Sequence, residues 1–317
     1  MNEARRETLW GLAFTSPWLV GSAAFMFLPM AISLYYSFTD YPMLEPPLWV
    51  GLDNYRRMLH DPVFRRAVSN TLIFASVSIP LVTAAALVLA ALLSSPLLGR
   101  MRSFYQVAVF IPTLVPLVAS AMVWSWLFNG ENGLVNRLLA LVGIDGPIWL
   151  SDTNDLVAGS IRAVGLDPPA WLPGATWALL ALLLMTLWSV GQAVVIYIAA
   201  MQDIPTSLYE AAELDGMGPV RRFRSITIPM LSPVILFNVI VLTINTLQIF
   251  AAPYIMFRTK DGTNPGGLFY SMYLYDNAFV YLQMGYASAM AWLLLIATLF
   301  LTAVLFLASR RLVYYHA

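Results

Sequence analysis

The distribution of charge along the chain constrains its fold more than any other feature of the sequence. Six stretches contain no Asp, Glu, Lys, Arg or His, and every ionisable residue of these types lies outside them. Each stretch is longer than the ~20 residues that an α-helix needs to cross the hydrocarbon core of a bilayer. The stretches are 12–38, 70–93, 104–128, 174–200, 233–257 and 286–309. They predict an all-α integral membrane protein with six transmembrane helices in one membrane domain over 1–317.

The composition agrees with this prediction and excludes other classes of protein. Charged residues make up 11% of the chain, against roughly 25% in soluble domains. The 17 basic residues are balanced by 17 acidic residues, so the chain lacks the basic surplus that a nucleic-acid partner requires. The absence of cysteine excludes thiolate metal sites and cysteine nucleophiles.

The basic residues in the loops indicate the orientation of the chain. With both termini in the cytoplasm, 9 of the 17 Lys and Arg residues lie inside, in loops that are shorter than the outside loops. Short loops count most in the positive-inside rule. Arg5 and Arg6 precede an apolar run that is too long for a signal-peptide core, so we interpret 12–38 as a retained helix.

The uncharged spans also limit the energy source for any transport. Proton-coupled transporters usually carry Asp, Glu or His inside their spans, and none is present in the six stretches. Sodium coupling through backbone carbonyls and hydroxyls stays open. The single lysine, Lys260, is followed by Asp261 and forms no P-loop. We therefore expect the chain not to be an enzyme, and uphill transport would need energy from a partner.

The connection between the fourth and fifth stretches, 201–232, contains the most distinctive pattern. Ser207 and Glu210 match a Ser-x-x-Glu capping box, which predicts a helix that begins one residue after Ser207. Gly216 is expected to end that helix. A second short helix should follow, and Pro229 should separate it from the next span. An ordinary amphipathic loop on lipid headgroups is the alternative interpretation.

This connection resembles the EAA loop of binding-protein-dependent ABC importer permeases. The residues that carry the resemblance are Glu210, Ala211, Ala212, Asp215, Gly216, Ile228 and Pro229. The resemblance implies a cytoplasmic coupling helix, between helices four and five, that docks on an ATPase subunit. It also implies that this chain binds no cofactor, because ATP and Mg are held by two ATPase subunits. The other implied partners are a second permease subunit and an extracytoplasmic solute-binding protein, in the inner membrane of a bacterium or archaeon.

Segments near the first two spans resemble the sugar subfamily of these permeases, in particular its maltose-type first permease in the six-span form. They are 37–41, 49–55, 61–64 and 70–71. The resemblance implies that the chain forms half of a pathway for a mono- or oligosaccharide. A glycerol-phosphate or polyol permease, a stand-alone secondary transporter and a non-transporting scaffold are the alternatives. Since the spans contain no cation, a neutral sugar is favoured over a phosphorylated one.

Three amide side chains mark the fifth span as a candidate substrate pathway. At 100° per residue, Asn245 lies within about 20° of Asn238 and Gln248 within about 80°. Amides both donate hydrogen bonds to sugar hydroxyls and accept them. Two interpretations stay open: a polar cavity, or hydrogen bonds between the two permease subunits.

Weaker candidates lie in the third and fourth spans. Trp188, Gly191 and Gln192 resemble a Trp-x-x-Gly pattern of the family, and an aromatic ring suits the C–H faces of a sugar. Thr113 lies between two prolines that can open the helix beside a pathway. Subunit packing is the alternative for Trp188, and a hydroxyl bonded to its own helix is the alternative for Thr113. No metal site is expected.

A local repeat occupies the outside loop between the third and fourth spans. Residues 142–150 recur as 164–172 with six of nine positions identical. The duplication either enlarges a contact surface for a solute-binding protein or is a neutral expansion of the loop. It is too short to indicate a solenoid.

Overall fold

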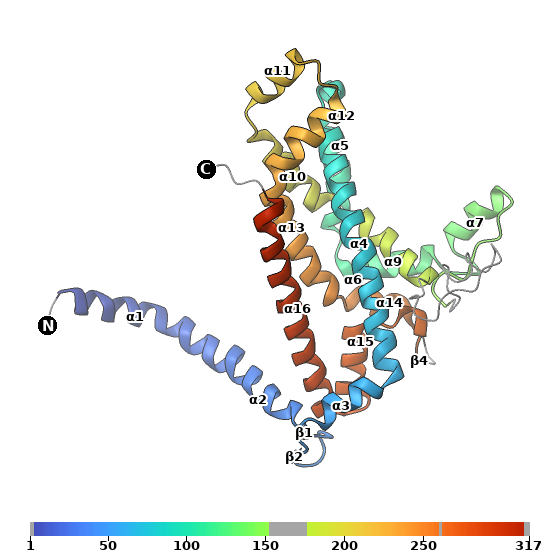
Figure 1. Ribbon diagram of the computed structural model, residues 1–317. Coiled ribbons are helices and arrows are strands. Elements are labelled where there is room, and N and C mark those ends of the chain that lie inside the picture. Colours follow the sequence, from blue (N-terminus) through green and yellow to red (C-terminus); the bar gives the residue numbers. More distant parts are fainter. Residues whose placement is uncertain (1–2, 152–175, 260–261, 314–317) are drawn as a thin grey trace. The chain divides into compact units, whose positions relative to one another are not determined.

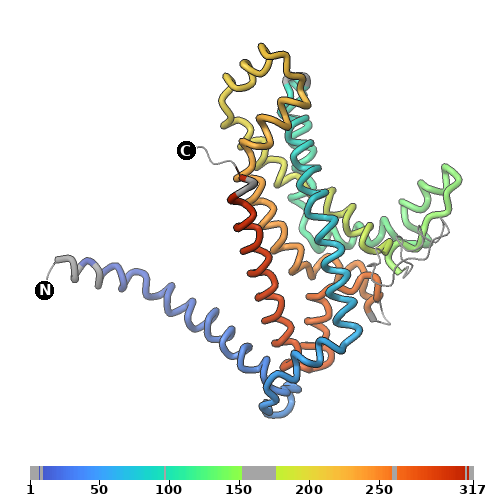
Figure 2. The backbone as a smooth tube through the Cα atoms, in the orientation of Figure 1, coloured from blue at the N-terminus to red at the C-terminus, as the bar shows by residue number. Residues whose placement is uncertain are grey.

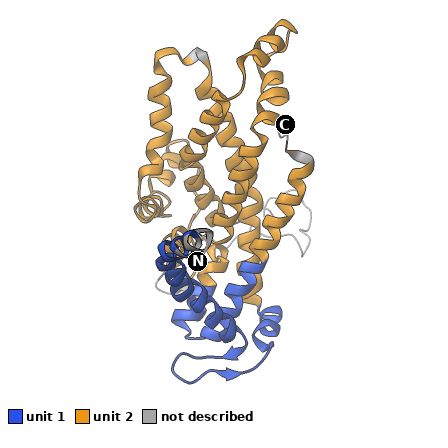
Figure 3. Cartoon of the chain, turned by 90° about the vertical axis from the view of Figure 1, so that its left-hand side faces the viewer, with its two compact units in different colours: residues 1–61, 274–296 blue, residues 62–273, 297–317 orange. Residues whose placement is uncertain are grey.

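The computed structural model describes residues 3–151, 176–259 and 262–313. The second copy of the repeat, 164–172, lies outside the described residues. The chain forms two compact units, one of residues 1–61 with 274–296 and one of residues 62–273 with 297–317 (Figure 3).

The first unit contains a long N-terminal helix and a short strand pair (Figure 1). Its elements are α1 (Glu3–Ser22), the π-helical turn η1 (Ala23–Phe27), α2 (Leu28–Ser37), β1 (Thr39–Asp40), β2 (Leu48–Trp49), α3 (Asp53–His60), the π-helical turn η6 (Asp276–Val280) and the first part of α16 (Met284–Leu312). The strands are antiparallel, with Thr39 opposite Trp49.

Side-chain hydrogen bonds hold α3 against the end of α2. The buried Asn54 amide donates to the carbonyl oxygens of Ser37 at 3.0 Å and Thr39 at 2.9 Å. The Tyr55 hydroxyl donates to the Ser37 hydroxyl at 2.9 Å. The bond to the Ser37 carbonyl satisfies an acceptor that the end of α2 leaves without a helical partner.

The second unit contains most of the helices. Its elements are α4 (Pro62–Ser94), η2 (Pro96–Met101), α5 (Arg102–Phe110), η3 (Ile111–Leu114), α6 (Leu117–Leu127), α7 (Leu134–Leu141), α9 (Trp177–Trp188), α10 (Gly191–Gln202), α11 (Thr206–Leu214), α12 (Pro219–Arg222), the π-helical turn η4 (Phe223–Thr227), α13 (Ile228–Leu247), α14 (Ala251–Phe257), the antiparallel strands β3 (Arg258–Thr259) and β4 (Gly262–Thr263), η5 (Pro265–Gly267) and α15 (Tyr270–Tyr275), whose last residues belong to the first unit.

The core of the second unit lies where α4, α10 and α13 pack together. Val82, Ala86 and Ala90 recur every four residues and therefore lie on one face of α4. The two alanines are fully buried, and their small side chains let neighbouring helices approach closely. Val194 and Tyr197 of α10 belong to the same cluster.

The helices agree with the predicted all-α membrane fold. Among the described residues, four are long and apolar enough to span a bilayer: Trp10–Ser37, Pro62–Ser94, Pro219–Leu247 and Met284–Arg310. Two bent pairs raise the number to six if each counts as one span. They are Leu98–Leu114 with Leu117–Leu127, bent by 96°, and Trp177–Trp188 with Gly191–Gln202, bent by 44°.

The sharper bend falls within the uncharged stretch 104–128, at the Val115–Pro116 peptide. Val115 is extended, with ψ at 127°, as expected for a residue before proline. Pro116 then precedes the first residue of α6. The fifth stretch, 233–257, is also divided, because α13 ends at Leu247 and α14 begins at Ala251.

The expectation that Pro229 separates a short helix from the fifth span is wrong. The chain is helical without a break from Pro219 to Leu247 (Figure 2). Pro229 lies in the first turn of α13, directly after the π-helical turn η4. The wider π-helical turn accommodates a residue that cannot donate a backbone hydrogen bond.

Candidate functional site

The predicted coupling helix is α11, which lies beyond the end of α10 (Figure 1). The capping box expected at its start is wrong. The helix begins at Thr206, Pro205 occupies the N-cap position, and among the described residues no side chain caps it. Ser207 is therefore already the second helical residue, and it does not occupy the flanking position from which a capping hydroxyl acts.

The predicted end of α11 at Gly216 is confirmed. Gly216 has a φ of +73°, in the left-handed region that glycine adopts without a steric penalty. The Met217 N–H donates to the Ala212 carbonyl at 2.9 Å across this turn. The geometry is that of a glycine C-cap, which satisfies carbonyls at the end of a helix.

Two faces of α11 differ in exposure. Ala212 is 4% exposed and packs within the chain, and the half-buried Tyr209 shares this inner face three residues earlier. Glu210 and Ala211 are exposed, and Leu214 is 90% exposed. The second alanine of the motif thus serves packing inside this chain, and the outer face presents a carboxylate beside a large apolar side chain.

The segment after α11 folds back over the turn. The Arg222 guanidinium lies 3.2 Å from the Glu213 carboxylate, in an ion pair between a half-buried arginine and an exposed glutamate. Val220, between α11 and η4, is 80% exposed. Asp215 is the C-cap residue of α11, and Pro229 lies in the first turn of α13.

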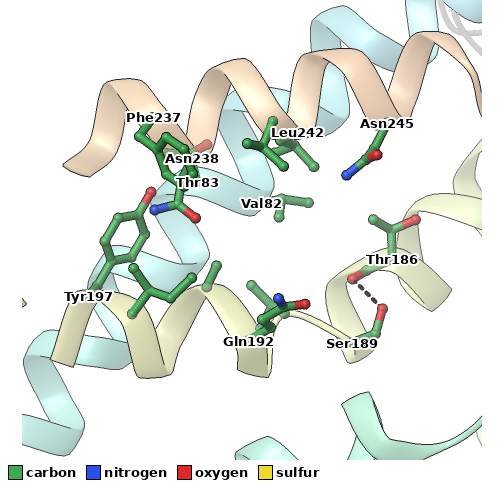
Figure 4. Close-up of a pocket in the computed structure, with 14 residues that line it drawn as sticks. Val82, Thr83, Thr186, Ser189, Gln192, Tyr197, Phe237, Asn238, Leu242 and Asn245 are labelled. Atoms are coloured by element: carbon green, nitrogen blue, oxygen red, sulfur yellow. Dashed lines mark hydrogen bonds between the residues drawn. The ribbon is translucent and has the colours of Figure 1, made fainter. Parts of the chain in front are cut away.

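A cavity of about 420 Å³ lies between α4, α9, α10 and α13 in the second unit (Figure 4). Its lining residues come from the described part of the chain, and none is charged. They are Val82, Thr83, Thr186, Ser189, Val190, Gln192, Ala193, Ile196, Tyr197, Phe237, Asn238, Val241, Leu242 and Asn245. Its volume falls in the range of small-molecule sites.

The structure brings three of the predicted pathway residues together in this cavity. Asn238 and Asn245 project from α13, and Gln192 projects from α10 on the facing side (Figure 4). The Asn238 amide nitrogen donates to the Val234 carbonyl at 3.0 Å, a bond within its own helix. Two of the amides that share one face of the predicted fifth span therefore lie across the cavity from a third amide, which belongs to the fourth span.

Hydroxyl groups that the sequence interpretation missed also line the cavity. Thr186 lies in the last turn of α9 and Ser189 at its C-cap, where the chain bends into α10, and Thr83 lines the cavity from α4. The Ser189 hydroxyl donates to the Thr186 carbonyl at 3.1 Å, and the Thr186 hydroxyl to the Leu182 carbonyl at 2.8 Å. Thr186, Ser189 and Gln192 recur every three residues, a signal that the sequence contains. The buried Tyr197 carries no comparable signal.

The other four predicted pathway residues do not line the cavity. Gln248 follows the last residue of α13 and is exposed. Trp188 is 41% exposed and contacts Trp124 edge to face, with ring centroids 6.0 Å apart. The Thr113 hydroxyl donates to the Phe110 carbonyl at 2.7 Å, which supports a hydroxyl bonded to its own helix.

Gly191 lets α10 approach α5 closely. A Cβ atom at this position would collide with the Val109 carbonyl oxygen and lie 2.9 Å from the Phe110 Cα atom. The absence of a side chain is therefore required by backbone contact. The roles of Gly191, Gln248, Trp188 and Thr113 in a pathway stay predictions.

Within the described residues, no group of three or more His, Asp or Glu side chains is placed to hold a metal ion. The site therefore consists of two parts in the second unit: an uncharged polar cavity among the helices, and an exposed helix, α11, at the end of α10. Together they define a membrane-spanning permease. Residues 64–314 match the family described as "Binding-protein-dependent transport system inner membrane component".

Similar proteins agree with this match. The chain is 35% identical to the probable ABC transporter permease protein YesP of Bacillus subtilis strain 168, over 99% of this chain and 94% of that protein. It is 33% identical to the lactose transport system permease protein LacF of Rhizobium radiobacter, over 95% and 94%. A crystal structure of a bacterial ABC transporter that imports the acidic polysaccharide alginate shares the fold, with a TM-score of 0.80 at 21% identity and 98% of each chain covered.

The chain belongs to the binding-protein-dependent transport system inner membrane component family. It is a multi-pass inner membrane protein and a permease component of a binding-protein-dependent ABC transport system, which confirms the resemblance to that family seen in the sequence. In this family the permease is a transport component, and ATP hydrolysis belongs to a separate ATPase partner. A solute-binding protein is a partner of such importers, as the family description states.

Proposed function

We propose that this chain forms half of the translocation pathway for a neutral mono- or oligosaccharide that a solute-binding protein delivers. The observation that carries the proposal is the chemistry of the cavity. Its amides and hydroxyls match the donors and acceptors of a sugar, and its apolar side chains match the C–H faces of a sugar ring. The lactose permease relative supports a sugar as the solute.

The absence of charge among the lining residues favours a neutral solute over the alternatives. A glycerol-phosphate permease would need cationic groups for the phosphate, and neither Arg nor Lys lines the described cavity. The same argument separates this cavity from one suited to an acidic polysaccharide. A polyol shares the hydroxyl chemistry of a sugar and is the second candidate solute.

We further propose that α11 couples the pathway to ATP hydrolysis in a partner. Its outer face combines the Glu210 carboxylate with Leu214, and Val220 follows beyond the turn. Exposed apolar side chains that lie together mark protein interaction sites. The coupling residues are Glu210, Ala211, Ala212, Asp215, Gly216 and Pro229.

The proposed assembly contains this chain, a second permease subunit, two ATPase subunits that hold ATP and Mg, and the solute-binding protein. The connection 201–232, which contains α11, and both termini lie in the cytoplasm. The distribution of Lys and Arg among the loops supports this orientation. Closure of the ATPase subunits on ATP displaces α11 and switches the cavity between outward-facing and inward-facing states. Two conformations of the cavity, one open to each side of the membrane, are sufficient for this switch.

The charge reversal Glu210→Lys tests the proposal. We expect the complex reconstituted in proteoliposomes to lose solute-stimulated ATP hydrolysis and solute uptake together. Glu131→Lys is the matched control, because Glu131 is an exposed carboxylate outside α11. If no ATPase subunit is retained on purification and uptake persists in Glu210→Lys, the chain is a stand-alone transporter. If no sugar stimulates hydrolysis in the wild-type complex, the sugar assignment is wrong.

A further inference from the structure

The helix that carries the cavity amides begins with an unusual turn. The Ile228 N–H donates to the Phe223 carbonyl, five residues earlier, where an α-helix would use a residue four positions earlier. The following residue, Pro229, has no N–H, and its ring would press on the carbonyl of Ser225 in a regular α-helix. The π-helical turn η4 relieves this conflict.

The same arrangement occurs in the first unit. The Leu28 N–H donates to the Ala23 carbonyl five residues earlier, and Pro29 follows. A proline one position after the closing residue therefore accompanies η1 and η4, whereas the third π-helical turn, η6, has Leu282 at that position. The shared position of the proline in η1 and η4 supports Pro229 as the physical cause of η4.

One side-chain hydrogen bond joins α11 to this turn. The Tyr209 hydroxyl lies 2.8 Å from the Thr227 hydroxyl. Thr227 is the last residue of η4 and is 5% exposed, and α13 begins at the next residue. The bond therefore connects the inner face of α11 to the point at which the cavity helix starts.

The side chains around this bond pack against an apolar cluster that includes residues of the cavity lining. Tyr209, Phe223 and Ile226 pack against the apolar cluster that contains Leu231 and Tyr197. Tyr197 also lines the cavity. Packed side chains of this kind transmit displacement, because close-packed interiors yield little to compression.

We propose that Tyr209 and Thr227 are positioning residues that transmit the movement of α11 to α13. This inference rests on the proposed coupling function. A π-helical turn interrupts the regular hydrogen bonding of a helix. Without a bond to α11, this turn can deform when α11 moves, and the movement then does not reach α13. The hydrogen bond attaches Thr227, the last residue of that turn, to α11, so that α13 moves with α11 as a rigid helix. Asn238 and Asn245 lie roughly 16 Å and 27 Å from Thr227 along the helix axis, at 1.5 Å per residue.

The test measures solute uptake per ATP hydrolysed in proteoliposomes that contain the complete importer. Tyr209→Phe removes the phenolic hydroxyl and keeps the ring, and Thr227→Val removes the other hydroxyl and keeps the shape. Each variant should lower this ratio roughly fivefold, the factor that corresponds to one typical hydrogen bond. Thr227→Ser keeps a hydroxyl and should retain the wild-type ratio.

The double variant separates transmission from a general loss of packing. If both hydroxyls act through one bond, Tyr209→Phe with Thr227→Val should be no worse than either single variant. Thr206→Val is the matched control, because Thr206 is an exposed threonine on the same helix. An unchanged ratio in both single variants, or losses that multiply in the double variant, would overturn the inference.

The Glu210→Lys variant distinguishes this inference from the proposed function on which it rests. If Glu210→Lys leaves both solute-stimulated hydrolysis and uptake unchanged, the coupling role of α11 itself fails. If Glu210→Lys abolishes both and Tyr209→Phe leaves uptake per ATP hydrolysed unchanged, only the transmission by Tyr209 and Thr227 fails. Retention of the ATPase subunits and the midpoint of thermal unfolding show for each variant whether the complex is intact.

Discussion

The contact between α10 and α5 allows a prediction in which one methyl group decides the outcome. In Gly191→Ala, the added Cβ atom would meet two backbone atoms of α5, the Val109 carbonyl oxygen and the Phe110 Cα atom. The second contact would be 2.9 Å, and ordinary contacts begin at 3.4 Å, so the helices must separate by at least about 0.5 Å. Backbone atoms cannot turn aside as a flexible side chain can.

The expected cost follows from the energetics of overpacking. Inserting a methyl group into a well-packed interior costs ~1–3 kcal/mol. The gain in helix propensity from glycine to alanine is at most about 1 kcal/mol, and it is smaller for Gly191 because this residue begins α10. We therefore expect Gly191→Ala to destabilise the protein. In a chain of 317 residues, ~1 kcal/mol lowers the unfolding midpoint by roughly 1–2 °C.

Gly11→Ala is the matched control, because Gly11 lies within α1 and a Cβ atom there would meet nothing within 4 Å. Gly11→Ala raises helix propensity without a steric clash, so the midpoint of its thermal unfolding should equal or exceed that of the wild type. Thermal unfolding in detergent, followed by the fluorescence of the ten tryptophans, measures both variants. If Gly191→Ala is as stable as Gly11→Ala, the assignment of Gly191 to close helix packing is refuted.

Two further predictions concern the cavity and an outside loop. Asn245→Leu keeps the size of the side chain but removes the amide, and the loss of one or two hydrogen bonds to a sugar should reduce uptake about 5–30-fold; Asn132→Leu, in an exposed loop, should reduce it little, and equal effects would contradict a substrate role for Asn245. The Asn136 amide donates to the Gly130 and Pro147 carbonyls and accepts from the Trp149 indole N–H at 2.6 Å. Asn136→Leu should therefore cost about 1–3 kcal/mol locally and speed proteolysis of the 129–150 loop, and an unchanged cleavage rate would show that these bonds do not hold the loop.

The apolar stretches and the EAA-like motif could be recognised in the sequence because each is defined by residues that are close together along the chain. The lengths without charge predicted membrane helices, and Gly216 predicted the end of α11. The pattern at Ser207 failed because a proline at the N-cap shifted the start of α11 by two residues. The sequence predicts a helix break at Pro229, whereas in the structure a π-helical turn precedes Pro229 and the helix continues.

The sequence by itself determined that the chain crosses a membrane, that its spans are uncharged, and that it carries a motif that resembles the EAA loop. Helical periodicity also placed Asn238 and Asn245 on one face of a helix. Only the tertiary structure decided that this face meets Gln192 and the hydroxyls at the bend after α9. It also decided that Ala212 faces inward and that Tyr209 reaches Thr227. The physical reason is that periodicity relates residues within one helix, whereas which helices adjoin, and where they bend, depends on packing between segments far apart in the chain.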